Sequence, residues 1–314
     1  MIKKLLVLFV SMAISGGLYA QEKTINKSFT GVDEIKLNTG SGDCQIVKGG
    51  STVEITVVYT YDDDEFEAVF EQEGSSLSLE EKFESGSHSG SSKWKLVVPD
   101  NINLKFNTGS GDFSAKSIAI AMKSNSGSGD VTLDNVSGQV KVNTGSGETD
   151  IDAFDGTLKV NAGSGDVDLG SSKGTFAINL GSGDIEASKL TGEFSMNTGS
   201  GDIYGSDLSL TAASGFNSGS GNAKVVLKSE LKYDISLASG SGNATLDFNG
   251  LDIKGEITMK ANKKNGDISA PFEFDNVTEE KNGNQITVKK TAKIGNSDVK
   301  IRVATGSGRA TIEK

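Results

Sequence analysis

Apolar and polar residues alternate in short runs along most of the chain, and the runs return at a regular interval. In the stretch GSGDVTLDNVSGQVKVNT, which starts at Gly127, apolar side chains fall at Val131 and Leu133 and again at Val140 and Val142. A period of two is typical of strands with one buried face, so each repeat is predicted to hold two short strands. We expect the corner between them at a recurring glycine: Gly138, Gly156, Gly174 and Gly192.

A turn of sequence Gly-Ser-Gly, followed by an acidic or amide residue, sets the interval. Its first glycines recur at a constant spacing, at Gly109, Gly127, Gly145, Gly163, Gly181 and Gly199, with looser copies at Gly219 and Gly240 and outlying ones at Gly40 and Gly306. A fixed period of this length means that one small unit stacks on itself. No helical period interrupts the repeats, and parallel crossovers are overwhelmingly right-handed. The prediction is therefore an all-β, right-handed parallel β-helix solenoid with about 18 residues per rung.

Two stretches break the repeat. Residues 51–105 hold an alternating strand, an acidic run and three more short strands, which predicts an antiparallel excursion near the N-terminal end of the stack. Residues 250–314 hold longer strands and the hairpin signal Lys-Asn-Gly-Asn at 281–284, and are expected to cap the other end. Residues 21–314 are thus read as a single β-helix domain, with the regular repeats in 106–249.

Asparagine recurs two residues before the first glycine of the turn. Its positions are Asn38, Asn107, Asn125, Asn143, Asn161, Asn179, Asn197 and Asn217. Stacked amides can bond from rung to rung at the strand spacing of about 4.8 Å. We expect an inward-facing asparagine ladder that satisfies buried turn backbone.

The residue after the turn forms an acidic column. It comprises Asp43, Asp112, Asp130, Glu148, Asp166, Asp184 and Asp202, continued by Asn222 and Asn243. Carboxylates at this spacing repel one another by roughly 1 kcal/mol in water, so something must offset the charge. Turn amides that donate to each carboxylate are the favoured explanation, because neutral Asn222 and Asn243 keep that bond. The alternative is a row of calcium ions on Asp112, Asp130, Glu148, Asp166, Asp184 and Asp202, although the motif departs from that of calcium-binding solenoids.

No catalytic residue is assigned. The turn serines need a nearby base, and the only histidine, His88, lies in the Gly/Ser-rich stretch 85–92. A polysaccharide lyase or hydrolase would need an acid and a base in one asymmetric cleft, which the regular repeats do not indicate. The run Asp62–Asp63–Asp64–Glu65 is read as a solvated hairpin tip. No cofactor is predicted, and Cys44, which stands alone, cannot form an intramolecular disulfide.

Residues 1–20 are read as a secretory signal peptide, with Lys3 and Lys4 before a short apolar run. No later run is long enough to span a bilayer. The net charge of −11 makes the chain a poor binder of nucleic acid. The expected location is periplasmic, cell-surface or extracellular.

The NTGSGD turn, the Gly-Asp-apolar-x-apolar pattern, the leader and the Val98-Pro99 lead-in resemble a family of exported bacterial repeat proteins, the auto-transporter adhesin (head GIN domain) group and related domains of unknown function. The resemblance covers roughly residues 29–314. It implies an exported, right-handed parallel β-helix with no assigned enzyme activity. We therefore expect a non-catalytic, adhesin-like or structural module whose flat faces bind a glycan or a cell-surface protein, with the lyase and the calcium-stabilised solenoid as alternatives.

Overall fold

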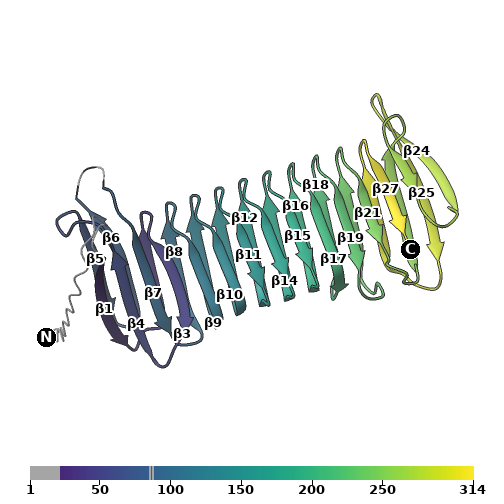
Figure 1. Ribbon diagram of the computed structural model, residues 1–314. Coiled ribbons are helices and arrows are strands. Elements are labelled where there is room, and N and C mark those ends of the chain that lie inside the picture. Colours follow the sequence, from purple (N-terminus) through teal and green to yellow (C-terminus); the bar gives the residue numbers. More distant parts are fainter. Residues whose placement is uncertain (1–21, 85, 87) are drawn as a thin grey trace.

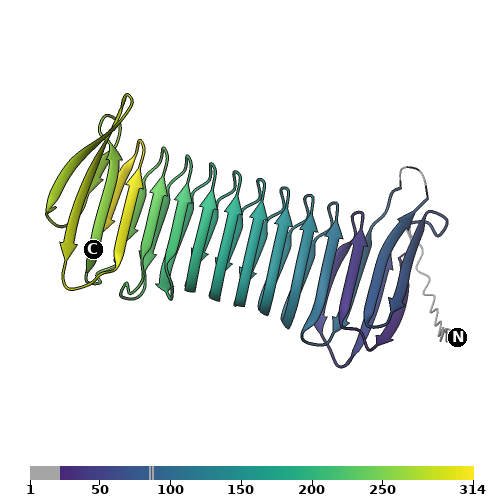
Figure 2. The same cartoon turned by 180° about the vertical axis from the view of Figure 1, so that it is seen from behind.

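The computed structural model describes residues 22–84, 86 and 88–314, and within these residues every regular element is a strand. The strands build a long, narrow stack, with the first strands of the chain near one extremity and the last strands near the other (Figures 1 and 2). The expectations of an all-β chain and of parallel strands are confirmed. The predicted signal peptide, residues 1–20, lies outside the described residues. No helix in the described part of the chain is long and apolar enough to cross a membrane.

Two sets of parallel strands form the stack. Sheet 1 contains the strands that follow each Gly-Ser-Gly turn: β3 (Asp43–Lys48), the first halves of β9 (Phe113–Ser126) and β10 (Val131–Thr144), β11 (Thr149–Asp152), β13 (Val167–Gly170), β15 (Ile185–Ser188), β17 (Ile203–Leu210), β19 (Ala223–Leu227), β21 (Ala244–Asp247) and β27 (Arg309–Glu313). Sheet 2 contains the strands that precede the next turn: β2 (Glu34–Thr39), β8 (Ile102–Thr108), the second halves of β9 and β10, β12 (Asp155–Ala162), β14 (Lys173–Leu180), β16 (Thr191–Thr198), β18 (Ser214–Ser218), β20 (Ile235–Ser239), β26 (Lys300–Thr305) and β22 (Gly255–Asn262).

The register follows the sequence repeat. In sheet 1, Thr149 of β11 pairs with Val167 of β13, and in sheet 2, Leu158 of β12 pairs with Phe176 of β14. Both steps equal one sequence repeat and run in the same direction, so equivalent side chains form straight columns along the stack. One strand of sheet 1 and the strand of sheet 2 that follows it are called a rung below.

The outlying copies of the turn also belong to the stack. The N–H of Gly109 donates to the carbonyl of Gly40 at 2.9 Å, and the N–H of Ser307 donates to Gly240 at 3.2 Å. The chain therefore leaves the stack after β3, returns at β8, and at the other end runs past the final rung before β26 and β27 pair with β20 and β21.

Further strands extend both ends, and most of them make an antiparallel pair. At the N-terminal end these are β1 (Lys23–Thr30), β4 (Thr52–Tyr59), β5 (Phe66–Glu73), β6 (Ser76–Phe83) and β7 (Ser92–Val98). At the C-terminal end β23 (Asp267–Ser269) continues sheet 1, and β25 (Gln285–Ile294) and β24 (Asn276–Asn282) continue sheet 2. The hairpin signal at 281–284 is confirmed as the turn between β24 and β25, where Gly283 has a φ of 57°.

Apolar side chains from both sheets fill the interior. Phe154, Phe176, Phe194 and Phe216 are fully buried in successive rungs, and neighbouring ring centroids lie 6.4, 5.6 and 6.0 Å apart. The rings of Phe154 and Phe176 meet edge to face, those of Phe176 and Phe194 are stacked and those of Phe194 and Phe216 are tilted, and such ring contacts add to the gain from area burial. The column shows why each rung requires its neighbours, since one rung alone would leave both faces of every ring in water.

The turn is held by a side chain that the sequence reading did not assign. A Thr or Ser hydroxyl directly before the turn accepts the N–H of the turn's second glycine at 2.7–3.2 Å, in Thr108, Ser126, Thr144, Thr198, Ser239 and Thr305. Backbone contact explains the glycine itself. A Cβ on Gly147 would lie 2.1 Å from the carbonyl oxygen of Gly129 in the neighbouring rung, so no side chain fits there.

The corner between the two strands of a rung differs from the prediction. The chain bends at a residue with positive φ that is not glycine, in Ser117, Asn135, Ala153, Ser171, Lys189 and Asp207, with φ of 47–58°. The predicted corner glycines lie three residues further on; Gly156 and Gly174 fall inside β12 and β14. They are needed because a Cβ on Gly156 would meet the carbonyl of Gly138 at 2.0 Å.

Candidate binding faces

The outer faces of the two sheets are the broad surfaces of the molecule, and the columns that cross them are the candidate sites. On sheet 2 the asparagine ladder is present: Asn143 Nδ2 donates to Asn125 Oδ1 at 2.9 Å, and the same bond joins the rungs from Asn38 to Asn217 at 2.7–3.3 Å. The expectation that it faces inward is wrong. Strand alternation buries Val142 and turns Asn143 outward, half-buried, so the amides bond to one another and not to buried turn backbone.

The acidic column lies at the start of sheet 1 and bonds to the main chain. The N–H of Asp184 donates to Asp166 Oδ1 at 2.8 Å, and that of Asp202 to Asp184 Oδ1 at 2.7 Å. Asp112 and Asp130 accept the same bond from the next residue of the column at 2.9 and 2.8 Å. These bonds offset the repulsion within the column by using each carboxylate as a backbone acceptor.

The same geometry bears on the calcium candidates Asp112, Asp130, Glu148, Asp166, Asp184 and Asp202. The structure places them in one exposed file, one rung apart, and their side chains bond along the file without converging on a common point. Among the described residues, no three or more His, Cys, Asp or Glu side chains are grouped so that they could hold a metal ion.

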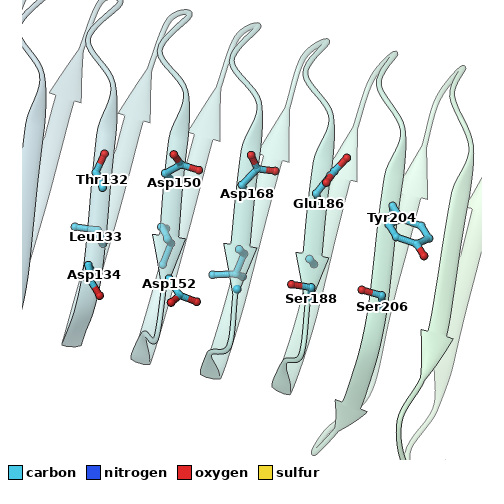
Figure 3. A pocket seen from close by; sticks show the side chains of 14 residues that line it. Thr132, Leu133, Asp134, Asp150, Asp152, Asp168, Glu186, Ser188, Tyr204 and Ser206 are labelled. Carbon is cyan, nitrogen blue, oxygen red and sulfur yellow. The ribbon is translucent and has the colours of Figure 1, made fainter.

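A second set of carboxylates stands on the outer face of sheet 1. Thr132, Asp150, Asp168, Glu186 and Tyr204 occupy one column of paired strands, and Figure 3 shows their side chains at one level across five neighbouring strands. A second column beside it holds Asp134, Asp152, Gly170, Ser188 and Ser206. The short side chains of this second column leave a shallow hollow of about 440 Å³.

Crowding changes the acidity of the central carboxyl group. Partial burial, together with the charges of Asp150 and Glu186 in the same column and of Asp166 and Glu148 nearby, raises the pKa of Asp168 above its ordinary value. Among the described residues, no basic side chain contributes to the shift of the Asp168 pKa. The central part of sheet 1 is therefore a negatively charged surface, which repels anionic partners.

Sheet 2 carries the opposite charge over its N-terminal half. Lys36, Lys105, Lys123, Lys141 and Lys159 occupy one column of paired strands, from β2 through β8, β9 and β10 to β12, and are called the lysine row. Their alternation with buried residues turns all five outward. The row ends at Ser78 on one side and Ala177 on the other, both neutral. The sequence pattern does not reveal the whole row, because the lysines follow the repeat only from Lys105 to Lys159, and Lys36 joins them through the pairing of β2 with β8.

Two of the five lysines share one carboxylate. Lys105 Nζ lies 2.6 Å from Glu34 Oε1, and the hydrogen bond from Lys105, with the charges of Lys105 and Lys36, holds the pKa of Glu34 below its ordinary value. Within the part of the chain that the structure describes, Lys123, Lys141 and Lys159 have no carboxylate within 4.0 Å, although the chain as a whole is acidic. The row is thus a local concentration of uncompensated positive charge.

Three further candidates from the sequence, in the acidic run 62–65, at Cys44 and at His88, make contacts within the fold. Asp63 of the acidic run accepts a hydrogen bond from the Tyr59 hydroxyl at 3.0 Å and pairs with Lys23 at 2.9 Å, and these contacts lower its pKa. Cys44 is fully buried in sheet 1, which raises the pKa of its thiol far above its ordinary value and makes it unreactive. His88 stacks on Phe83 at the N-terminal end, with ring centroids 5.3 Å apart, and its Nε2 lies within hydrogen-bond distance of the Glu84 carbonyl.

A carboxylate at the N-terminal end replaces a missing rung. Glu81 of β6 is buried and accepts hydrogen bonds from the Gly40 N–H at 3.0 Å, from the Trp94 indole N–H at 2.8 Å and from the Ser92 hydroxyl. The first turn of the stack is closed in this way. The three donors account for the burial of a charged side chain without a catalytic role.

Comparison with known proteins gives a family and distant structural relatives. The family model described as Toastrack DUF4097 matches residues 32–252, and no curated protein matches the sequence. A proposed cell adhesion protein from Clostridium sporogenes is 16% identical, with 93% of this chain and 99% of that chain covered and a TM-score of 0.25. A proposed lipid binding protein from Parabacteroides distasonis is also 16% identical, with 93% and 97% covered and a TM-score of 0.39. A proposed adhesin from Bacteroides fragilis is 10% identical, with 94% and 100% covered and a TM-score of 0.33. Likeness at this level carries no functional conclusion.

Proposed function

The chain belongs to the Toastrack DUF4097 family, and from the charges on its two faces we propose that it is an exported, non-catalytic binding module of the adhesin-like kind. The partner lies along the outer face of sheet 2. The scaffold is a right-handed β-helix of about 18 residues per rung, consistent with the hand of parallel crossovers. The excursions within residues 51–105 and 250–314, outside the stack strands β8, β22, β26 and β27, serve as its two end regions, and residues 1–20 as the export signal.

The lysine row is the observation that carries this proposal. Five side chains of one charge lie in one column on a face of a protein whose net charge is −11. Neither turn formation nor core packing requires lysine at these outward positions. Uncompensated like charges in register destabilise a sheet, so a binding role explains their retention better than a structural one.

The shape of the face supports a binding role over catalysis. The outward residues repeat from rung to rung, so neighbouring positions along the face have similar surroundings. A hydrolase or lyase needs a catalytic acid and a catalytic base whose pKa values differ because their environments differ. A face of repeating composition instead offers many equivalent contacts, which suits retention of an extended partner by multivalent attachment.

The proposal is tested with the mature chain, residues 21–314, immobilised and exposed to a panel of anionic, neutral and cationic polymers. Retention and polymer length are measured together. The expected result is retention of anionic polymers that weakens as salt is added, with their length unchanged. Shortening of any retained polymer, or no retention of any charged polymer at low salt, would contradict the proposal. Cell fractionation tests export separately.

A further inference from the structure

We propose that the lysine row binds a linear anionic polysaccharide, a polyuronate, which lies parallel to the long axis of the stack. This inference rests on the proposed function and names the partner of the same face. Lys123, Lys141 and Lys159 provide the central contacts, because no carboxylate among the described residues lies within 4.0 Å of them.

The spacing of the row fits a single extended chain. Adjacent lysines are one strand apart, about 4.8 Å, so five of them extend over roughly 19 Å in single file. A polymer with one carboxylate per sugar presents its charges in a line and can meet successive ammonium groups. The row is one lysine wide, so it matches one strand of polymer better than a two-dimensional array of charges.

Apart from Glu34, which continues the flanking column of Asn103, the side chains on both sides of the row are uncharged, and they lie where hydroxyl groups of a sugar would lie. On one side is the asparagine ladder, in which each bond between rungs uses one N–H and one lone pair of an amide that has two of each. On the other side are Asn103, Ala121, Gln139 and Thr157. The short side chain of Ala121 opens a shallow hollow of about 340 Å³ beside the lysines, open at the surface.

Double-stranded DNA fits this face less well. Duplex DNA carries one charge per roughly 1.7 Å of its axis, or about 11 charges over the roughly 19 Å that the row covers. Five lysines, one already paired with Glu34, would neutralise fewer than half of them. The remaining acidic surface of the protein would repel the rest of the duplex.

A lipid surface also fits less well. The exposed large apolar side chains among the described residues are Tyr204, Tyr233 and Val277, and none belongs to the strands of the lysine row. A membrane would therefore meet lysines and amides with no apolar side chain to insert, and attraction to its headgroups would be electrostatic only.

The experiment measures binding of polygalacturonate oligomers of increasing length by calorimetry or fluorescence anisotropy. The matched probe is the same backbone with its carboxylates methyl-esterified. The test variant combines Lys123→Gln, Lys141→Gln and Lys159→Gln. The control variant combines Lys189→Gln, Lys228→Gln and Lys281→Gln, which are exposed lysines outside the row and remove the same charge.

The expected result is a loss of affinity on the order of 100-fold for the test variant, from about fivefold per lysine near an anionic surface. The control variant and the unmodified chain should bind alike. Affinity should rise with oligomer length until the row is covered, and esterification should abolish binding. Circular dichroism and the melting temperature (Tm) verify that both variants remain folded.

Three outcomes overturn the inference. If the test variant binds polygalacturonate as well as the control does, the row is not the site. If duplex DNA or vesicles with phosphatidylglycerol bind in a lysine-dependent way and polygalacturonate does not, the polymer class is wrong while the binding face stands. If the protein instead self-associates at low salt and the test variant does not, the partner of the lysine row is the acidic face of sheet 1 in a second copy of this chain. If none of these probes binds in a lysine-dependent way, the proposed function is rejected as well.

Discussion

The hydroxyl of Thr144 accepts a hydrogen bond from the N–H of Gly147 at 2.9 Å, across the turn that the two residues flank. Both groups are buried at this turn, so removal of the hydroxyl leaves an N–H without a partner. We expect Thr144→Val, which preserves the shape of the side chain, to lower the free energy of unfolding by about 1–3 kcal/mol. Chemical denaturation measures the change.

The chain provides its own control for this prediction. Ala162 and Leu180 occupy the position of Thr144 in the next two rungs and have no hydroxyl to donate or accept. Leu180→Val should therefore lack the penalty for an unsatisfied N–H, and Ala162→Thr should supply the missing acceptor to the Gly165 N–H and raise stability. Equal destabilisation by Thr144→Val and Leu180→Val would show that the hydroxyl has no special role.

Ala153 bends the chain with a φ of 55°, a conformation that costs an L-residue roughly 1–2 kcal/mol. Glycine adopts it freely but loses more backbone entropy on folding. We expect Ala153→Gly to raise the free energy of unfolding by about 0.5–1 kcal/mol. The paired variant Ala177→Gly, in the extended strand β14, should lower it by a similar amount. Thermal denaturation of both variants measures these changes. A loss of stability in Ala153→Gly would contradict the claim that the backbone of Ala153 is strained.

The sequence predicted the parallel stack and its columns but not the direction in which every column faces. Val142 and Asn143 alternate in the sequence, so the outward position of the asparagine ladder could have been deduced from its buried neighbour. The corner at Ala153 could not, because its equivalents are Ser, Asn, Lys and Asp, and no residue type marks the positive φ. The place of Gly40 beside Gly109 depends on a pairing between distant parts of the chain, which local patterns do not contain.

The lysine row shows the same limit for the candidate site. Lys105, Lys123, Lys141 and Lys159 have a visible period in the sequence, and the parity of their strands marks them as outward. Lys36 joins them only because β2 pairs with β8, after a long excursion of the chain. The lack of carboxylates near the central lysines is a property of three-dimensional neighbours, which composition and net charge conceal.

The acidic column is expected to need no cation. Each of the carboxylates that bonds to the next rung already has a main-chain donor, as in the bond from the Asp202 N–H to Asp184. A chelator should leave the Tm unchanged, and added calcium should not raise it. Asp184→Asn should retain stability, because Asn222 makes the same contact with Asn243 at 3.0 Å, whereas Asp184→Ala should lose about 1–3 kcal/mol. A drop in Tm with chelator, or a loss in Asp184→Asn equal to that in Asp184→Ala, would favour the calcium alternative.

Asp168 is expected to make folding less favourable at neutral pH. Its pKa is raised in the folded protein, by partial burial first and then by Asp150, Glu186, Asp166 and Glu148. The folded state therefore binds more protons than the unfolded chain in the interval just above the ordinary aspartate pKa of about 3.9. The contribution of this group to the free energy of unfolding falls as the pH rises through that interval and stays low above it.

Replacement of Asp168 by Asn removes this penalty. Asp168→Asn should raise the Tm at pH 7. The corresponding gain in the free energy of unfolding should be less than about 1 kcal/mol, because solvent screens the surface charges. The gain should shrink as the pH falls below the ordinary aspartate pKa, where both states are protonated. Asp155→Asn is the control, since Asp155 pairs with Lys173 at 3.0 Å and its loss should bring no gain. Thermal melts of both variants across acidic and neutral pH measure the difference, and a gain that is independent of pH would assign it to packing and not to charge.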